Sequence, residues 1–190
     1  MSINPITIKG NWDEGYALDI HTISSDPIGE DVYGHMQYST VRSEMGELLY
    51  KFKYKGKYDI LQNILDLAKP FLDHWSVLNS VDIILPVPPS TQRIYQPAVE
   101  IAQAIAEYLN ISFSDKILQK ITDGKSKDMT RSNKNLTGSI IALLKAKKPH
   151  EILLVDDLYS TGATLEECVR VLRQDELLKR IYVLTMTKTR

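Results

Sequence analysis

Residues 151–165 constrain the fold more than any other part of the chain, because they combine a buried strand, two acids, a hydroxyl-rich loop and a helix. Residues 152–155 form an unbroken apolar run, which is typical of a strand buried on both faces. Asp156 and Asp157 stand at the predicted end of that strand. Apolar residues then recur at the spacing of an amphipathic helix: Leu165, Cys168, Val169 and Leu172.

The loop between the two acids and the helix is suited to binding a phosphate. In a parallel sheet, ligands bind beyond the carboxyl ends of the strands, where the opening amides of a helix attract anions. Gly162 lets the backbone curve around an anion, and its neighbours offer hydroxyl donors. Adjacent carboxylates can accept hydrogen bonds from a ribose diol. We therefore predict a sugar phosphate, with its diol on Asp156 and Asp157. Its phosphate is predicted on the loop: Ser160, Thr161, Gly162, Ala163 and Thr164.

An alternative needs no ligand: Ser160 or Thr161 simply caps the helix, and the acids are ordinary loop residues. Within the helix, Glu166 is placed to pair with Arg170. Cys168 is the one cysteine of the chain, which excludes an internal disulfide or a cysteine-built zinc site. Its position on the apolar face indicates a packed core thiol.

The complete string favours the ligand. Val155-Asp-Asp-Leu-Tyr-Ser-Thr-Gly-Ala-Thr164 resembles the signature with which type I phosphoribosyltransferases bind phosphoribosyl pyrophosphate (PRPP). The resemblance implies an α/β fold of the type I phosphoribosyltransferase class, a mostly parallel sheet flanked by helices. It also implies a glycosyltransferase that moves ribose 5-phosphate from PRPP to a nucleophile and releases pyrophosphate. Asp156 and Asp157 would bind the ribose of PRPP, and residues 160–164 its 5-phosphate.

A second strand, loop and helix precede this unit. Residues 81–85 predict a buried strand, residues 86–93 a stiff proline-rich loop, and residues 98–109 an amphipathic helix. Both loops are expected on the same edge of a parallel sheet. The proline loop resembles the pyrophosphate loop of the family, and this resemblance implies the pyrophosphate contacts: Ser90, Thr91, Gln92 and Arg93.

Residues 122–135 are polar and show no period. On their own they indicate disorder with solvated lysines. In the type I family, however, a loop at this place closes over the site, so the resemblance implies a lid that shields the reaction from water. The candidate catalytic residues are then Lys127 and Arg131 on the lid, together with Asp157 as the candidate general base.

The remaining segments give shorter predictions. Residues 1–42 are expected to form an N-terminal β extension packed on the phosphoribosyltransferase domain, residues 43–190. Within the extension, we expect strands near 15–22 and 35–42 around a turn at 24–31, with Asp19 and His21 on a solvated face. Further elements are expected in order: a helix over 43–54, a helix over 58–72 bent or ended by Pro70, a short strand over 111–113, a strand or helix over 138–144, and a strand over 181–185.

Composition excludes several classes of partner. A net charge of −1 gives no reason to expect nucleic acid as the main partner, although residues 50–58 alternate lysine with mostly aromatic residues. We expect the aromatic side chains there to be packed and the lysines to be solvated. No apolar run is long enough for a membrane helix and no signal-peptide pattern is present, so a cytoplasmic protein is expected. The four histidines show no metal-ligand spacing, so no protein-held metal is expected, and Mg²⁺ is expected to arrive on PRPP.

The order of elements is also similar to that of the competence protein F group, often called amidophosphoribosyltransferase-like. Besides the signature, this similarity depends on the proline loop, the basic loop and Asn135-Leu-Thr-Gly138. The cysteine-rich zinc module common in that group is missing, and residues 94–97 replace its Gly-Phe-Asn-Gln. Without a nucleophilic N-terminal cysteine, we do not expect glutamine chemistry.

Two functions therefore stay open, a phosphoribosyltransferase or a non-catalytic PRPP-binding regulatory or accessory protein. A weaker alternative is a role in DNA uptake, taken from the name of the competence protein F group. The acceptor is not identified, and a homodimer is expected from the resemblance alone.

Overall fold

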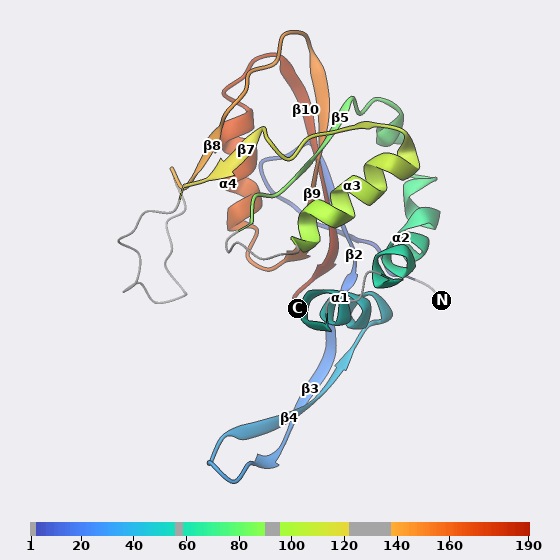
Figure 1. The fold of residues 1–190 in the computed structure, drawn as a ribbon, viewed down its shortest axis with the longest axis vertical. Coiled ribbons are helices and arrows are strands. Elements are labelled where there is room, and N and C mark those ends of the chain that lie inside the picture. The colour runs from blue at the N-terminus through green and yellow to red at the C-terminus, as the bar shows by residue number, and fades with distance from the viewer. Residues whose placement is uncertain (1–2, 56–58, 90–95, 122–137) are drawn as a thin grey trace.

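A six-stranded sheet forms the centre of the molecule in the computed structural model, which describes residues 3–55, 59–89, 96–121 and 138–190. Its strand order is β1-β2-β10-β9-β5-β6 (Figure 1). The strands are β1 (Ile6–Thr7), β2 (Glu14–Ile20), β5 (Ile83–Pro86), β6 (Ser112–Phe113), β9 (His150–Tyr159) and β10 (Leu178–Lys188). β1 is antiparallel to β2 and the other neighbours are parallel. This confirms the predicted mostly parallel sheet.

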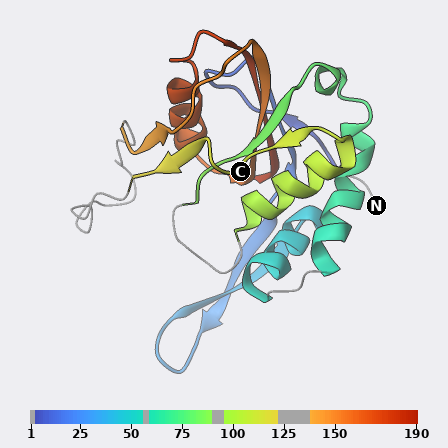
Figure 2. The same cartoon turned by 45° about the horizontal axis from the view of Figure 1, so that its top comes forward.

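Helices cover both faces of the sheet. One face packs against α1 (Glu44–Lys55), α2 (Asp59–Leu72) and α3 (Pro97–Leu109), and the other against α4 (Ala163–Leu172). A short antiparallel pair, β7 (Leu118–Lys120) and β8 (Ile140–Ala142), lies beside α4, as Figure 2 shows from a second direction. A 3-10 helix, η1 (Ser76–Asn79), precedes β5. In the part of the chain that the structure describes, no helix is both long and apolar enough to cross a membrane.

The apolar run in β9 is explained by its central position. Leu153 and Val155 pack into the core beneath α1, α2 and α3, whereas Ile152 and Leu154 pack beneath α4. All four side chains are buried. Because each face of the strand carries a helix layer, the alternation of a half-exposed strand is absent, as predicted.

The two strand-loop-helix units diverge at the boundary between β5 and β9. From β5 the chain passes through α3 to β6 at the sheet edge, and from β9 it passes through α4 to β10 on the other side. The two helices lie on opposite faces of the sheet. Where neighbouring parallel strands connect to opposite sides of a sheet in this way, a crevice forms beyond their carboxyl ends. The Val87 amide donates to the Val155 carbonyl over 2.8 Å and holds these ends together.

The N-terminal segment contributes to two sheets. β2 pairs with β10, so the main sheet includes residues on both sides of the predicted boundary at residue 42. β3 (Thr22–Glu30) and β4 (Met36–Arg42) form a ribbon that extends away from the body (Figure 1). The predicted turn over 24–31 is wrong, because these residues pair along β3. The chain turns instead after Asp31, whose Oδ1 accepts the amides of Tyr33 and His35.

Irregular pairing explains how turn-forming residues fit a strand. The β3–β4 register shifts between Pro27 and Gly29, a bulge that accommodates residues unsuited to a regular ladder. The ribbon also exposes large apolar side chains, with Ile28, Val32 and Tyr33 exposed by 67%, 93% and 82%.

The helix predictions over 43–54, 98–109 and 165–172 are confirmed as α1, α3 and α4. α2 continues for two residues past Pro70. One predicted side-chain pair is wrong: Arg170 Nε binds Glu167 Oε2 at 2.7 Å instead of binding Glu166. The Glu167 side chain is buried and also accepts a hydrogen bond from the Gly138 amide. This contact holds the Glu167 carboxylate in place beside Arg170.

Candidate functional site

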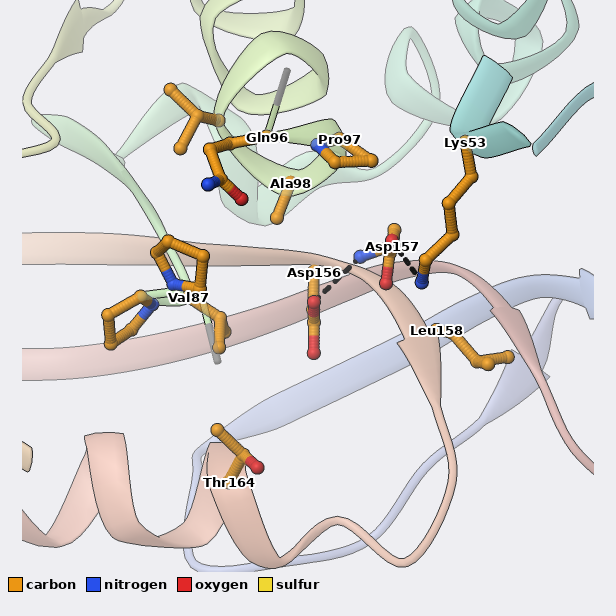
Figure 3. A pocket seen from close by; sticks show the side chains of 12 residues that line it. Lys53, Val87, Gln96, Pro97, Ala98, Asp156, Asp157, Leu158 and Thr164 are labelled. Carbon is orange, nitrogen blue, oxygen red and sulfur yellow. Dashed lines mark hydrogen bonds and ion pairs between the residues drawn. The ribbon is translucent and has the colours of Figure 1, made fainter. Parts of the chain in front are cut away.

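A pocket of about 290 Å³ lies at the carboxyl ends of β5 and β9, where the two units diverge. Its walls come from four parts of the chain (Figure 3): Lys53 of α1, the segment after β5 with the start of α3, the end of β9, and the start of α4. The lining includes Val87, Pro88, Pro89, Gln96, Pro97, Asp156, Asp157, Leu158 and Thr164. A small molecule fits a cavity of this size.

The two predicted acids lie together in this pocket. Asp156 pairs with Thr185 of β10 in the sheet, and the Asp157 amide donates to Asp156 Oδ1 over 2.8 Å. Both carboxyl groups line the pocket, so the sequence prediction that they form one polar site is consistent with their placement.

The environment favours the protonated form of Asp156. Burial, and then the nearby charge of Asp157, raise the pKa of the Asp156 carboxyl group to about 7. The hydrogen bond from the Asp157 amide and the charges of Lys53 and Lys120 act in the opposite direction. Near neutral pH, this carboxyl group can therefore be either a donor or an acceptor toward a hydroxyl.

The predicted phosphate loop forms a second, smaller cavity of about 70 Å³ beside the pocket. The two cavities share Asp156, Leu158 and Thr164. The complete predicted set lines the smaller one: Ser160, Thr161, Gly162, Ala163 and Thr164. The cavity adjoins the first turn of α4, where backbone amides lack intrahelical partners and favour an anion.

Gly162 fixes the shape of this loop. It has φ +82°, a left-handed conformation that side chains rarely adopt, and it is the N-cap of α4. A Cβ atom there would lie 2.8 Å from the Tyr159 hydroxyl oxygen. The alternative prediction of a Ser160 or Thr161 cap is therefore wrong, although the Ala163 amide does reach Thr161 Oγ1 at 3.4 Å.

Lys53 is a site residue that the sequence did not reveal. Its ammonium group lies 3.2 Å from Asp157 Oδ2, with 30% of the lysine side chain and 17% of the aspartate side chain exposed. We expected the lysines of this segment to be solvated. Lys51 matches that expectation more closely, since it is 43% exposed and pairs with Glu47. Nothing in the local sequence separates the two lysines, because only the packing of α1 turns one toward the pocket.

His21 lies close enough to Arg42 and Lys53 to be affected by the charge of both. His21 Nδ1 is 3.1 Å from Thr187 Oγ1, and its pKa is lowered by burial and then by the charges of Arg42 and Lys53. The Arg42 guanidinium group lies 4.0 Å from the centre of the Tyr50 ring. The expectation that Asp19 and His21 are surface residues is wrong, since Asp19 is buried and His21 is half-buried.

Several predicted site residues lie outside the described residues. These are the pyrophosphate contacts Ser90, Thr91, Gln92 and Arg93 and the lid residues Lys127 and Arg131. The residues that flank the proline loop do line the pocket, with Pro88 and Pro89 on one side and Gln96 on the other. Within the described ranges, no three metal-ligating side chains gather into one group.

A model of the phosphoribosyl transferase domain family matches residues 94–188, half of the chain. The matched segment contains α3, both acids, the whole phosphate loop, α4 and β10. Lys53 and β5 lie before it. No curated protein matches this sequence.

Solved structures similar to this chain include a UMP synthase and two phosphoribosyltransferases. The UMP synthase of Leishmania donovani has 20% identity and a TM-score of 0.40, over 80% of this chain and 25% of that one. The orotate phosphoribosyltransferase of Aeropyrum pernix has 14% identity and a TM-score of 0.44, over 86% and 74%. The purine phosphoribosyltransferase of Pyrococcus horikoshii Ot3 has 17% identity and a TM-score of 0.41, over 67% and 70%. This chain thus spans a quarter of the UMP synthase.

Proposed function

Since this chain belongs to the phosphoribosyl transferase domain family and has the type I phosphoribosyltransferase fold, we propose that it transfers ribose 5-phosphate from PRPP to a nucleophile. One observation carries the proposal: the two acids and the glycine-hydroxyl loop line adjoining cavities at the divergence of β5 and β9. A ribose on the acids could therefore place its 5-phosphate on the loop without leaving the crevice.

Each part of the site has a role in this proposal. Asp156 and Asp157 bind the ribose hydroxyls, and residues 160–164 with the first amides of α4 bind the 5-phosphate. Pyrophosphate is held toward the proline loop, where Ser90 to Arg93 stay a sequence prediction. Mg²⁺ comes with the pyrophosphate as part of the substrate, keeps several waters and needs few protein ligands.

The chemistry is a substitution at C1 of the ribose. The bond from C1 to pyrophosphate breaks, and the electron pair leaves with pyrophosphate. A bond from the nucleophile to C1 forms, and the nucleophile loses a proton. Positive charge develops on the ribose and negative charge on pyrophosphate, so the protein contributes mainly positioning and charge stabilisation. Asp157 as general base, and Lys127 and Arg131 as lid cations, stay predictions.

Calorimetric titration of PRPP with Mg²⁺ tests the proposal. The wild type should bind, and Asp156→Asn/Asp157→Asn should lose most of the affinity. Asp66→Asn is the control, because this exposed aspartate lies on α2 away from the pocket. Pyrophosphate release with added nucleophiles then separates a transferase from a regulator that only binds PRPP. A wild type that does not bind PRPP refutes both functions.

Within the family, we place the chain in the competence protein F, or amidophosphoribosyltransferase-like, group. This finer proposal is supported by the order of proline loop, basic loop and Asn135-Leu-Thr-Gly138 in the sequence. It predicts that transfer does not require glutamine. Pyrophosphate release that depends strictly on glutamine would contradict it.

A further inference from the structure

The pocket has two sides, defined by the strand order. Val87 follows β5 on one side of β9, whereas Lys53 comes from α1, which packs against β2 and β10 on the other side. In Figure 3 the two acids lie between Val87 and Lys53, with Thr164 below them. The side away from the proline loop therefore presents a cation of α1.

The proposed reaction gives each side a different role. The nucleophile adds to C1 on the face opposite the departing group when the substitution inverts that carbon. If pyrophosphate lies toward the proline loop, as proposed above, the nucleophile approaches from the side of α1. Lys53 is the described cation that lines the pocket from this direction.

Among the described residues, the Lys53 ammonium group has donors left for a ligand. It offers three hydrogen bonds, and one of them is directed at Asp157 Oδ2. Within the described ranges, the other carboxylate oxygen of Asp157 has no hydrogen-bond partner and is available for the ribose. Lys53 can thus bridge the ribose-binding acid and a second anionic acceptor, and a charged hydrogen bond of this kind is among the stronger polar contacts.

We propose that Lys53 binds an anionic group of the acceptor, so that the acceptor is a small nitrogen nucleophile carrying a carboxylate rather than a neutral base. This inference rests on the proposed function, because it assumes that PRPP occupies the site. It assigns Lys53 to acceptor selection, in addition to its ion pair with Asp157 of the proposed ribose site. Lys51, two residues earlier on the same helix, has no such role, because it pairs with Glu47 and is not among the described residues that line the pocket.

The test uses pairs of acceptors that differ in one carboxylate: nicotinate with nicotinamide, orotate with uracil, and anthranilate with aniline. Pyrophosphate release from PRPP with Mg²⁺ is measured for each compound, together with calorimetric binding of each compound to the PRPP-loaded full chain. The wild type should favour a carboxylate-bearing member in at least one pair. Lys53→Met should lower kcat/KM or affinity for that member about tenfold to hundredfold more than for its neutral partner, measured at saturating PRPP.

Two variants separate this role from a structural one. Lys53→Arg keeps the charge and should retain the preference for the carboxylate, while Lys51→Met removes a charge from the same helix and should change nothing. Equal losses for the carboxylate-bearing and the neutral member in Lys53→Met would assign the lysine to the PRPP site alone and overturn the proposal. So would a wild type that shows no preference for the carboxylate in release or binding. Either result leaves the proposed function standing, provided that PRPP binds in the separate titration.

Discussion

Replacing Asp156 by asparagine should stabilise the ligand-free protein at alkaline pH. The folded carboxyl group has a pKa of about 7, against an ordinary value of 3.8. The folded protein therefore binds more protons at this site than the unfolded chain does between those two values. Its free energy of unfolding consequently falls as pH rises through this window.

The magnitude follows from the size of the shift. A difference of about 3 pKa units corresponds to roughly 4 kcal/mol, at ~1.4 kcal/mol per unit, once pH exceeds 7. At pH 5 the free energy of unfolding of the wild type has fallen by only about 1.5 kcal/mol of this amount. Asparagine does not titrate and still offers Oδ1 to the Asp157 amide. The free energy of unfolding of Asp156→Asn, relative to that of the wild type, should therefore be about 2–3 kcal/mol higher at pH 8 than at pH 5.

Urea unfolding at pH 5, 6.5 and 8 measures this difference. Asp66→Asn is the control, since hydrogen bonds from Lys69 and Gln62 lower the pKa of that exposed carboxyl group, and its removal should bring no gain at any pH. An Asp156→Asn variant that is less stable than the wild type at pH 8, or whose advantage does not change with pH, would refute the reasoning.

Three further substitutions test the packing around the site, each by urea unfolding. Gly162→Ala should lower the free energy of unfolding by ~1–2 kcal/mol because of its left-handed backbone, and further because the new Cβ atom would meet Tyr159. Gly138→Ala, also at φ +82° but with open space around it, should lose only the backbone contribution. Equal losses for the two variants would contradict the contact with Tyr159. Glu167→Gln should cost about 1–3 kcal/mol, because the buried carboxylate accepts from Gly138 and Arg170, while Glu166→Gln should be nearly neutral. Leu154→Ala should cost ~2–5 kcal/mol because its side chain is fully buried, and the same change at the exposed Leu144 should cost under about 0.5 kcal/mol.

Local patterns were sufficient to predict most of the sheet and the place of the loop between β9 and α4. The apolar run in β9 identifies a strand covered on both faces, and the residues after Asp157 that were predicted to bind phosphate line one cavity at the start of the following helix. These features are encoded within a few neighbouring residues. Their prediction therefore needs no knowledge of distant contacts.

The features that sequence reasoning missed depend on contacts between distant segments. Lys53 is 104 residues from Asp157 in the chain, and only the packing of α1 brings them together. The residues of β3 are turn formers by composition, yet pairing with β4 extends them. The choice of Glu167 over Glu166 depends on Gly138, 29 residues away. Composition and periodicity do not report such contacts.

The position of β10 has a consequence for how the protein is made. β10 lies between β2 and β9, although it follows both of them, and β5 and β6, in the chain. During synthesis, β2 therefore has no partner on that side until β10 has left the ribosome, while β5 and β9 can already pair. We expect the N-terminal strand to join the sheet only after translation has passed residue 188, and a nascent chain stopped before β10 to leave the edge of β9 open to chaperones or aggregation.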